Sequence, residues 1–378
     1  MWIWILMYCG IGLGCAGGAF YLATRVRRFG FMKKLAQRSL KGSWLAAAAL
    51  VLIPAAILWM LWGAMNMAIC LIHLLAFWLL AEWVCAGVRR LRRRDFRRYW
   101  AGAAALLLCA AWLTMGWVNA NHVWQKRYAV ETDKAVGNLR IALLSDSHMG
   151  TTFHAEGFAG HLAAVQAQEP DLVVFAGDFV DEGTSRADMI AACRAMGGLD
   201  APFGVYYVFG NHDKNNYAGD DRAYTGEELA AELRLNGVTV LEDEAVLIDD
   251  RFYLIGRRDA SEKQAQSGER ASMAELTAGL DQTKFSIVLD HQPRDYAAQA
   301  ESGVDLVLSG HTHGGQLIPL KQLMGIRALS RDDNVYGLQT RGRTQFIVSS
   351  GISDWVLRFK TGCRSEVVMI DVQGRAPE

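Results

Sequence analysis

The chain has 378 residues and no formal net charge, because 39 Lys and Arg balance 39 Asp and Glu. The balance conceals two regions. Residues 1–118 hold 14 basic and two acidic residues, so this region carries about +12 and the remainder about −12. Opposite charge and unlike composition indicate two domains. The acidic second region disfavours a long nucleic acid as partner, and its length of about 250 residues suffices for one sizeable core.

Four apolar stretches in the first region are long enough to span a bilayer, for which a helix needs about 20 residues. They cover approximately residues 2–23, 44–62, 65–88 and 99–118. Pro54 lies within the second stretch, where a transmembrane helix tolerates it. The first stretch lacks the preceding basic segment of a cleaved signal peptide, which favours an uncleaved helix. The sequence therefore predicts four transmembrane helices within residues 1–118.

The basic residues predict how these helices are oriented. Seven Lys and Arg separate the first two stretches and seven Arg separate the last two, whereas the link Gly63–Ala64 has none. By the positive-inside rule, both basic loops lie in the cytoplasm. We expect a multi-pass protein of the cytoplasmic (inner) membrane whose large domain is periplasmic or extracellular. Contact with anionic lipids explains the arginine cluster better than nucleic-acid binding does, because the cluster lies between two spanning stretches.

Few groups inside the apolar stretches can ionise. His73 and Glu82 both lie in the third stretch, and an intramembrane ionisable group is a functional candidate. Glu82 is close enough to Arg89 to extend toward it, which favours a structural role. Two cysteines lie outside these stretches, and Cys193 and Cys363 could pair only if folding brought them together.

After a polar connector at residues 119–137, strand-like and helix-like stretches alternate, which indicates an α/β layered domain over residues 138–378. Helices are expected at residues 158–168, 187–196 and 227–236. Strands are expected at residues 139–144, 172–176, 205–209, 238–241, 252–255, 285–289, 304–308, 346–349 and 366–372.

Five of the expected strands end in residues of the kind that bind metal ions. These residues are Asp146, His148, Asp178, Asn211, His212, His291, His311 and His313. In an open α/β sheet, ligand sites form beyond the carboxyl ends of the strands, so we expect the five ends to converge on one crevice. Glycines around His311 and His313 let the backbone bend until both imidazoles face one point. Taken alone, that loop is equally compatible with a surface turn.

The motifs and their order resemble those of the calcineurin-like metallophosphoesterases, in the branch of small bacterial enzymes with membrane or secretion segments. They are Asp146-Ser147-His148, Gly177-Asp178-Phe179-Val180-Asp181, Gly210-Asn211-His212-Asp213, His291 and Gly310-His311-Thr312-His313-Gly314-Gly315-Gln316. The resemblance covers about residues 138–372. It implies a four-layer αββα sandwich that holds two divalent metal ions.

Carried over residue by residue, the resemblance assigns a role to each motif position. Asp146, His148 and His313 would bind one metal ion. Asn211, His291 and His311 would bind the other, and Asp178 would bridge the two. His212 would face the substrate as a catalytic residue. Asp181 or Asp213 would orient such side chains without binding a metal ion or the substrate.

A centre of this kind has a defined chemistry. Two cations about 3.5–4 Å apart need an anionic bridge, and neutral ligands leave the pair able to bind phosphate and acidify a water molecule. The resulting hydroxide would attack phosphorus in line. Mn, Fe and Zn all suit such mixed ligands.

We therefore expect a membrane-anchored hydrolase that cleaves a phosphomonoester, phosphodiester or pyrophosphate bond. Its substrate would be a phosphorylated small molecule, a lipid or a cell-envelope precursor. The alternative is a non-catalytic membrane protein that reuses the fold for binding. A transporter with an appended hydrolase is disfavoured, because His73 and Glu82 alone make a poor conduction path.

Five further polar residues are weaker candidates for lining the crevice. His154 and His161 are compatible with the site or with the surface. Arg257, Arg258 and Asp259 follow an expected strand, where a salt-bridged turn accounts for them equally well.

Overall fold

The computed structural model describes residues 2–214, 217, 222–263, 270–326 and 330–376, with the side chains of residue 10 and of residues 12 onward. The chain forms two compact units. One consists of Met1–Gly116 and Val356–Arg358, and the other of Trp117–Trp355 and Phe359–Glu378. Each unit is described by itself below.

The first unit is helical. Its helices are α1 (Trp2–Val26), α2 (Gly30–Arg38), α3 (Leu40–Arg92) and α4 (Trp100–Asn121), the last of which extends into the second unit. A small core that includes Leu22, Val51 and Trp78 joins them. Large apolar side chains on α3 and α4 are nevertheless exposed, among them Met60 at 86% and Leu107 at 72%. Such exposure suits a helix surrounded by lipid.

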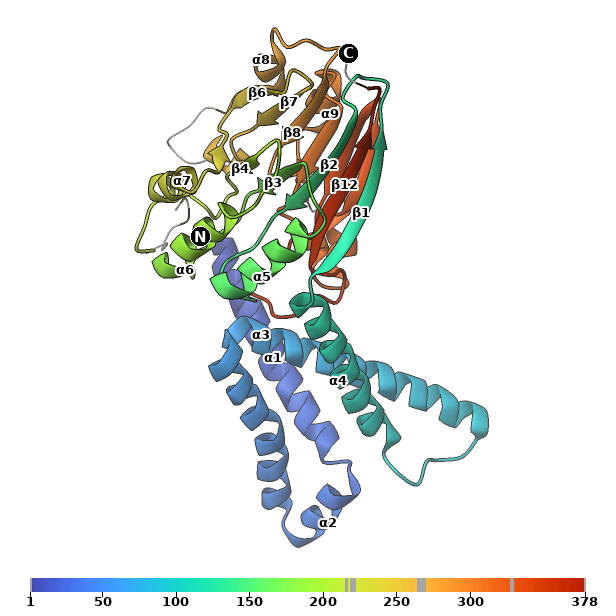
Figure 1. The fold of residues 1–378 in the computed structure, drawn as a ribbon. Helices are drawn as coiled ribbons and strands as arrows, with labels where there is room; N and C mark the ends of the chain where they lie inside the picture. Colours follow the sequence, from blue (N-terminus) through green and yellow to red (C-terminus); the bar gives the residue numbers. More distant parts are fainter. Residues whose placement is uncertain (1, 215–216, 218–221, 264–269, 327–329, 377–378) are drawn as a thin grey trace. The chain divides into compact units, whose positions relative to one another are not determined.

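Two helices of the described chain, α3 and α4, are long and apolar enough to cross a membrane. The prediction of four such helices is therefore wrong in number. The second and third expected stretches lie in the single 53-residue helix α3, which is interrupted at Gly63 (φ 81°, ψ 168°). Uninterrupted, α3 would measure about 80 Å, far more than a bilayer. Figure 1 shows its two halves diverging at this break.

The ionisable groups of the third stretch have local partners. The Glu82 carboxylate does not reach Arg89; it accepts hydrogen bonds from Arg28 Nη1 at 3.1 and 3.2 Å and from the Tyr99 hydroxyl. Trp78 Nε1 donates to the same hydroxyl at 2.8 Å. His73 Nδ1 lies 2.8 Å from the carbonyl oxygen one turn earlier. These contacts agree with structural roles for both residues.

The second unit contains two six-stranded sheets (Figure 1). The first has the order β1 (Trp124–Glu131), β12 (Glu366–Gln373), β2 (Asn138–Leu144), β3 (Leu172–Ala176), β4 (Val205–Val208) and β5 (Thr239–Val240). The second has the order β10 (Gly337–Arg341), β11 (Thr344–Val348), β9 (Leu306–Ser309), β8 (Phe285–Leu289), β7 (Phe252–Gly256) and β6 (Glu244–Ile248). Strands β2 to β5 are parallel, as are β7, β8, β9 and β11.

Three apolar clusters define four layers. One lies between the sheets and includes Ile141, Val174, Leu254 and Ile287. A second packs the first sheet against α5 (Ala155–Gln166), α6 (Arg186–Met196) and α7 (Gly226–Leu235). A third packs the second sheet against α8 (Met273–Thr277) and α9 (Tyr296–Glu301). The expected αββα sandwich is confirmed, and both faces of its central strands are covered, which explains why β3 and β8 are buried throughout.

The nine expected strands and three expected helices all form, with ends shifted by up to three residues. The sequence did not reveal β1, β6, β10, α8, α9, α10 (Leu320–Met324) or the 3-10 turns Ala260–Lys263 and His313–Gly315. Strand β1 occupies part of the expected connector; of its eight residues only Val130 is buried, so its polar composition conceals it. Cys193 and Cys363 are free thiols.

Candidate metal centre

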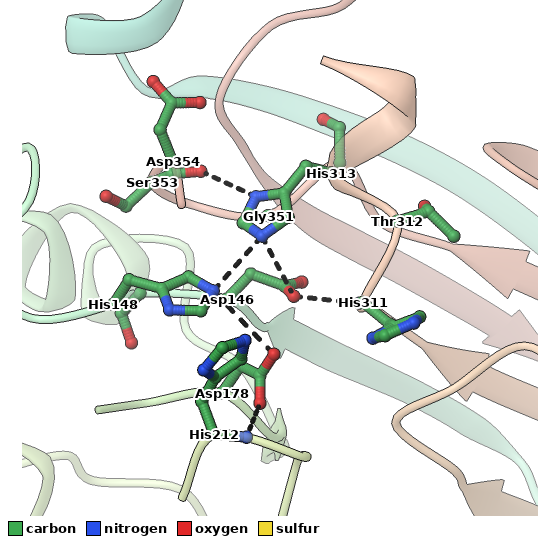
Figure 2. A network of polar contacts seen from close by, with 12 residues as sticks. Asp146, His148, Asp178, His212, His311, Thr312, His313, Gly351, Ser353 and Asp354 are labelled. Carbon is green, nitrogen blue, oxygen red and sulfur yellow. Dashed lines mark hydrogen bonds and ion pairs between the residues drawn. The ribbon is translucent and has the colours of Figure 1, made fainter. Parts of the chain in front are cut away.

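The carboxyl ends of five strands meet where the two sheets adjoin, as expected. β2, β3 and β4 supply side chains from the first sheet, and β8 and β9 supply them from the second. The seven residues expected to bind metal ions are all brought together. Figure 2 shows Asp146, His148, Asp178 and His313 clustered together, with His311 beside them.

Three of these side chains form a first group of donors. The ligand atoms of Asp146, His148 and His313 lie within 4.8 Å of one another. The Nε2 atoms of His148 and His313 are 3.2 Å apart, and Asp146 Oδ1 is 3.7 Å from His313 Nε2. Two imidazole nitrogens this close can share only one proton between them. A cation between them would satisfy both lone pairs, so the group fits a metal ion.

Asp178, His291 and His311 form a second group, again with ligand atoms within 4.8 Å. Asp178 Oδ2 is 3.0 Å from His291 Nε2 and also 3.8 Å from His148 Nε2, which belongs to the first group. The Asp178 carboxylate therefore lies between the two groups, where a bridging ligand must lie. Among the described residues, the buried Asp146 Oδ2 and His311 Nδ1 have no hydrogen-bond partner, as expected of atoms that face cations.

Asn211 extends the second group. Its Oδ1 lies 3.2 Å from His291 Nε2, while its Nδ2 donates a hydrogen bond to the Tyr217 hydroxyl at 2.8 Å. Because the amide nitrogen is engaged by Tyr217, the oxygen is the atom left to face the group. Tyr217 was not predicted from the sequence.

The loops that present these side chains have a strained backbone. Asp146, His148, Asp178, His311 and His313 all have positive φ, between 36° and 72°. Residues with a side chain rarely adopt this conformation, and it is concentrated at functional sites. At Gly177 (φ 80°) an added Cβ would lie 2.6 Å from the backbone nitrogen of Gly210 and 2.7 Å from His291 Nδ1. Glycine is thus required where two ligand loops touch.

Asp213 fixes the position of the bridging residue. Its carboxylate is fully buried and accepts hydrogen bonds from the backbone N–H groups of Asp178 at 2.8 Å and of Gly210 at 2.6 Å. It also accepts from the two residues after Asp178. Asp178 Oδ1 in turn accepts from the backbone N–H of His212 at 2.9 Å. Asp213 therefore joins the loops after β3 and β4 and does not contact His212 through its carboxylate.

The other two acidic residues near the site support imidazoles. Asp181 Oδ2 lies 3.4 Å from His148 Nδ1, which orients this ring toward the first group. The residue that contacts His212 is Glu182, whose Oε1 is 2.9 Å from His212 Nδ1. Burial lowers the pKa of His212, but Glu182 and Asp178 outweigh it and the pKa is raised. The sequence pointed to Asp181 or Asp213 for this role; Glu182 was missed because its neighbour Asp181 fits the motif.

Electrostatics favour the cation-binding protonation states of Asp178, His311 and His313. Burial alone would raise the pKa of Asp178, yet the adjacent His291 holds it well below its ordinary value. Burial lowers the pKa of His313, aided by His148, and that of His311, aided by His291. Neutral imidazole is the form that binds metal ions. The pKa of His291 is raised by Asp178 although burial opposes this, so a cation must displace a proton there.

A buried lysine forms hydrogen bonds with the backbone of the loop that contacts His313. Lys360 is fully buried, and its Nζ donates hydrogen bonds to the carbonyl oxygens of Ser350 and Ser353, both at 2.8 Å. Asp354, also fully buried, lies 3.4 Å from the same ammonium group. The Ser353 carbonyl faces His313 Nδ1 at 3.3 Å, as Figure 2 shows. Lys360 therefore acts on His313 through one carbonyl group.

The weaker candidates lie in other networks. His154 is exposed and its Nδ1 is 3.0 Å from Asp188 Oδ2, while the ring of His161 packs on Phe153. Arg257 is buried and donates to Asp290 at 2.8 Å. Arg258 approaches Asp243, and Asp259 accepts from Gln292. None of the five belongs to either donor group within the described chain.

We expect Lys360→Met to destabilise the chain and weaken its metal affinity. The change leaves the buried Asp354 carboxylate without its partner, which costs about 3–5 kcal/mol. It also frees the carbonyl that orients His313, and losing such support typically weakens metal affinity about 10–100-fold. Thermal unfolding and metal titration measure the two effects.

The matched control is Lys284→Met, which removes a half-buried lysine that pairs with the exposed Asp250. It should leave both measurements nearly unchanged. Adding Asp354→Leu to Lys360→Met should recover part of the lost stability, because no buried charge then remains unpaired. Equal behaviour of Lys360→Met and the control would show that the buried ammonium does not support the site.

Comparison with known proteins identifies relatives of the second unit. Residues 139–315 match the family described as Calcineurin-like phosphoesterase. An uncharacterized metallophosphoesterase of Campylobacter jejuni is 29% identical over 259 residues, which cover 66% of this chain and 63% of the relative. One of Aquifex aeolicus is 28% identical over 253 residues, covering 66% of this chain and 92% of that protein.

A Bos taurus protein named transmembrane protein with metallophosphoesterase domain is 30% identical over 253 residues. The match covers 63% of this chain and 54% of that protein. The chain thus matches a little over half of the bovine protein and about three fifths of the Campylobacter one.

The matched region begins in β2 and ends just after His313, so it includes all seven of the side chains that converge on the centre. The two mixed sheets and the paired donor groups agree with this match. Over residues 139–315, the chain is thus similar in sequence, fold and donor groups to the calcineurin-like phosphoesterases.

Proposed function

We propose that this protein is a membrane-anchored phosphoesterase that uses two divalent metal ions to hydrolyse phosphoester or pyrophosphate bonds. The observation that supports this best is the position of Asp178 Oδ2, 3.0 Å from His291 and 3.8 Å from His148. A carboxylate between two groups made mostly of imidazole donors suits a pair of cations, because it lessens their repulsion without cancelling their charge.

The ligand assignment follows from the two donor groups. Asp146, His148 and His313 would hold one ion; Asn211, His291 and His311 would hold the other, with Asp178 shared. Bound there, the ions would attract phosphate oxygens and lower the pKa of a water molecule. The mixture of imidazole, carboxylate and amide suits Mn, Fe or Zn.

His212 is proposed to act on the substrate. Its Nδ1 is held by Glu182 at 2.9 Å, which leaves Nε2 as the ring nitrogen available to a phosphoryl or leaving-group oxygen. Its backbone N–H is anchored on Asp178. The ring therefore stands beside the bridging carboxylate, where it can donate a hydrogen bond to developing negative charge or protonate the leaving oxygen.

The amino-terminal region, residues 1–118, is proposed to anchor the phosphoesterase domain, residues 138–378, in a membrane. The two long apolar helices and the bovine relative's name support this. By the positive-inside rule, the basic segments at residues 25–41 and 89–98 would lie on the cytoplasmic side of the membrane. Because the break at Gly63 lets α3 cross twice and α4 crosses once, the phosphoesterase domain would lie on the outer side of the cytoplasmic membrane.

The proposed location suggests the substrate class: a phosphorylated small molecule or a lipid-linked phosphate, and no long nucleic acid.

A non-catalytic binding module is the competing function. It is disfavoured because the seven side chains proposed as ligands lie close together and His212 lies beside them. The deciding experiment removes metal from the purified full chain and restores Mn, Fe or Zn. Chromogenic mono- and diesters and a lipid pyrophosphate then serve as substrates; metal-dependent binding without turnover of any of them would favour the binding module.

Asp178→Asn should abolish activity together with metal binding, since a neutral amide cannot offset the charge of two cations. We expect the metal content to fall to one ion or none and kcat/KM to fall by more than the roughly 10–100-fold seen for supporting residues. Metal analysis and the diester assay measure both.

The control for Asp178→Asn is Asp249→Asn, the same change at an exposed position that also has positive φ, 50°. It should retain two metal ions and full turnover. Two metal ions and unchanged turnover in Asp178→Asn would contradict the bridging role.

His212→Ala should lower kcat about 10²–10⁴-fold with both metal ions retained, as for loss of a general acid. Glu182→Ala should lower kcat less, because it acts only through His212. Combining both changes should cost no more than His212→Ala alone. Steady-state kinetics of the four proteins test this.

The matched control is Glu156→Ala, an exposed glutamate in α5. Additive losses in the double variant would show that Glu182 acts independently of His212. A loss of metal from His212→Ala would instead make His212 a ligand.

A further inference from the structure

We propose that the helical unit binds one anionic phospholipid, with its phosphate in a basic cavity and an acyl chain in an adjoining apolar cavity. The inference rests on the proposed membrane anchoring but not on the phosphoesterase reaction. All residues involved belong to the first unit.

The basic cavity has a volume of about 430 Å³ and lies among α2, the second half of α3 and the start of α4. Five cationic side chains line it: Arg28, Lys33, Arg89, Arg97 and Arg98. Two acidic residues, Glu82 and Asp95, also line it. The cavity therefore has a net positive charge, and its volume is in the range of small-molecule sites.

Each of the two acidic residues lies near a cationic side chain. Glu82 is bound by Arg28 at 3.1 Å, and Asp95 lies 3.8 Å from Arg89. In the described part of the chain no ion pair reaches Lys33, Arg97 or Arg98. These three cations remain for an incoming anion, and arginine suits phosphate because its planar group donates two parallel hydrogen bonds.

The apolar cavity, about 380 Å³, lies between α1, both halves of α3 and α4. Its lining includes Leu50, Pro54, Leu74 and Leu106. A cavity of this kind offers no donors to a free phosphate ion. It suits a hydrocarbon chain.

Three aromatic rings lie at the border of the two cavities. Phe29 and Trp78 line the apolar cavity, and Tyr99 lines the basic one. Phe29 packs edge-on against both other rings, at 6.3 Å from Trp78 and 5.3 Å from Tyr99 between centroids. Trp78 Nε1 also donates to the Tyr99 hydroxyl. A polar cavity and an apolar one that border the same ring cluster match the two parts of one phospholipid.

The charge of the surrounding loops places such a lipid on the cytoplasmic leaflet, where anionic headgroups are plentiful. A free phosphate ion would occupy only the basic cavity. The two cavities together therefore favour the lipid over the free anion.

The test uses the full chain purified in detergent and exposed to phosphatidylglycerol, phosphatidylcholine or glycerol phosphate, with bound molecules counted by native mass spectrometry. We expect one phosphatidylglycerol to be retained, and neither of the other two. Equal retention of phosphatidylcholine, or equally tight binding of glycerol phosphate, would overturn the proposal.

Two variants test the basic cavity. Replacing Arg97 and Arg98 together by Gln should weaken phosphatidylglycerol binding about 30-fold, since each arginine near an anionic surface contributes about a fivefold gain. Replacing Arg93 and Arg94 by Gln removes the same charge from the same loop but no lining residue. An equal loss in both variants would mean general surface attraction and no site.

Two further variants test the apolar cavity. Leu106→Trp narrows it, whereas Leu107→Trp places the same ring on a neighbouring position that does not line the cavity. Only Leu106→Trp should reduce lipid retention, and equal effects would exclude this cavity as the acyl site. Hydrolysis of a soluble diester, measured on the same samples, should stay constant, so failure of the lipid site and failure of the proposed reaction are told apart.

Discussion

The second unit brings several lone-pair donors together in its interior, and the structure of the site depends on how their mutual repulsion is relieved. Two imidazole nitrogens stand 3.2 Å apart, and a buried carboxylate oxygen nearby has no partner among the described residues. Groups of this kind do not gather in a protein interior for stability, because the two nitrogens can share only one hydrogen bond and the carboxylate oxygen loses its water without gaining any. Cations reverse the balance, since every lone pair then faces a positive charge.

The fold holds this arrangement by making the strand ends rigid. β3 and β8 are buried along their whole length, so the residues that follow them begin from fixed positions. The loops then turn at once, with a backbone that side chains normally avoid. Asp213 offsets part of that strain by accepting several backbone N–H groups with one carboxylate. Strong apolar packing beneath the loops makes the strain above them tolerable.

Much of the centre could be predicted from the sequence because five short apolar strands, each followed at once by residues that bind metal ions, form a pattern that chance rarely produces. The parallel core of both sheets was visible because its strands are continuous apolar runs. Strand β1 was not visible in the sequence, because it is an edge strand with one buried residue and lacks the apolar pattern. The joining of the second and third apolar stretches in one helix was also not foreseen: hydropathy marks apolar runs, but a two-residue link does not reveal whether the helix stops there.

The supporting residues were harder to foresee. Glu182 and Tyr217 act through long side chains that return from neighbouring loops, and nothing local in the sequence specifies that return. Lys360 lies far along the chain from His313, and a single lysine in a mixed segment usually indicates exposure. Only the assembled structure shows that it is buried. The sequence therefore predicted the side chains that face the centre, but not the residues that position those side chains.

Each donor group draws on both sheets: Asp146 and His148 extend from the first sheet and His313 from the second, and the other group is divided in the same way. Bound cations would therefore cross-link the sheets along one edge. At other points of the sandwich the sheets are tied by ordinary side chains, such as Lys134, which reaches Asp305 at 2.7 Å. Loss of the metal ions would accordingly loosen one edge of the sandwich, while its apolar interior still held the sheets together. The metal centre would therefore stabilise the fold in addition to its proposed role in hydrolysis.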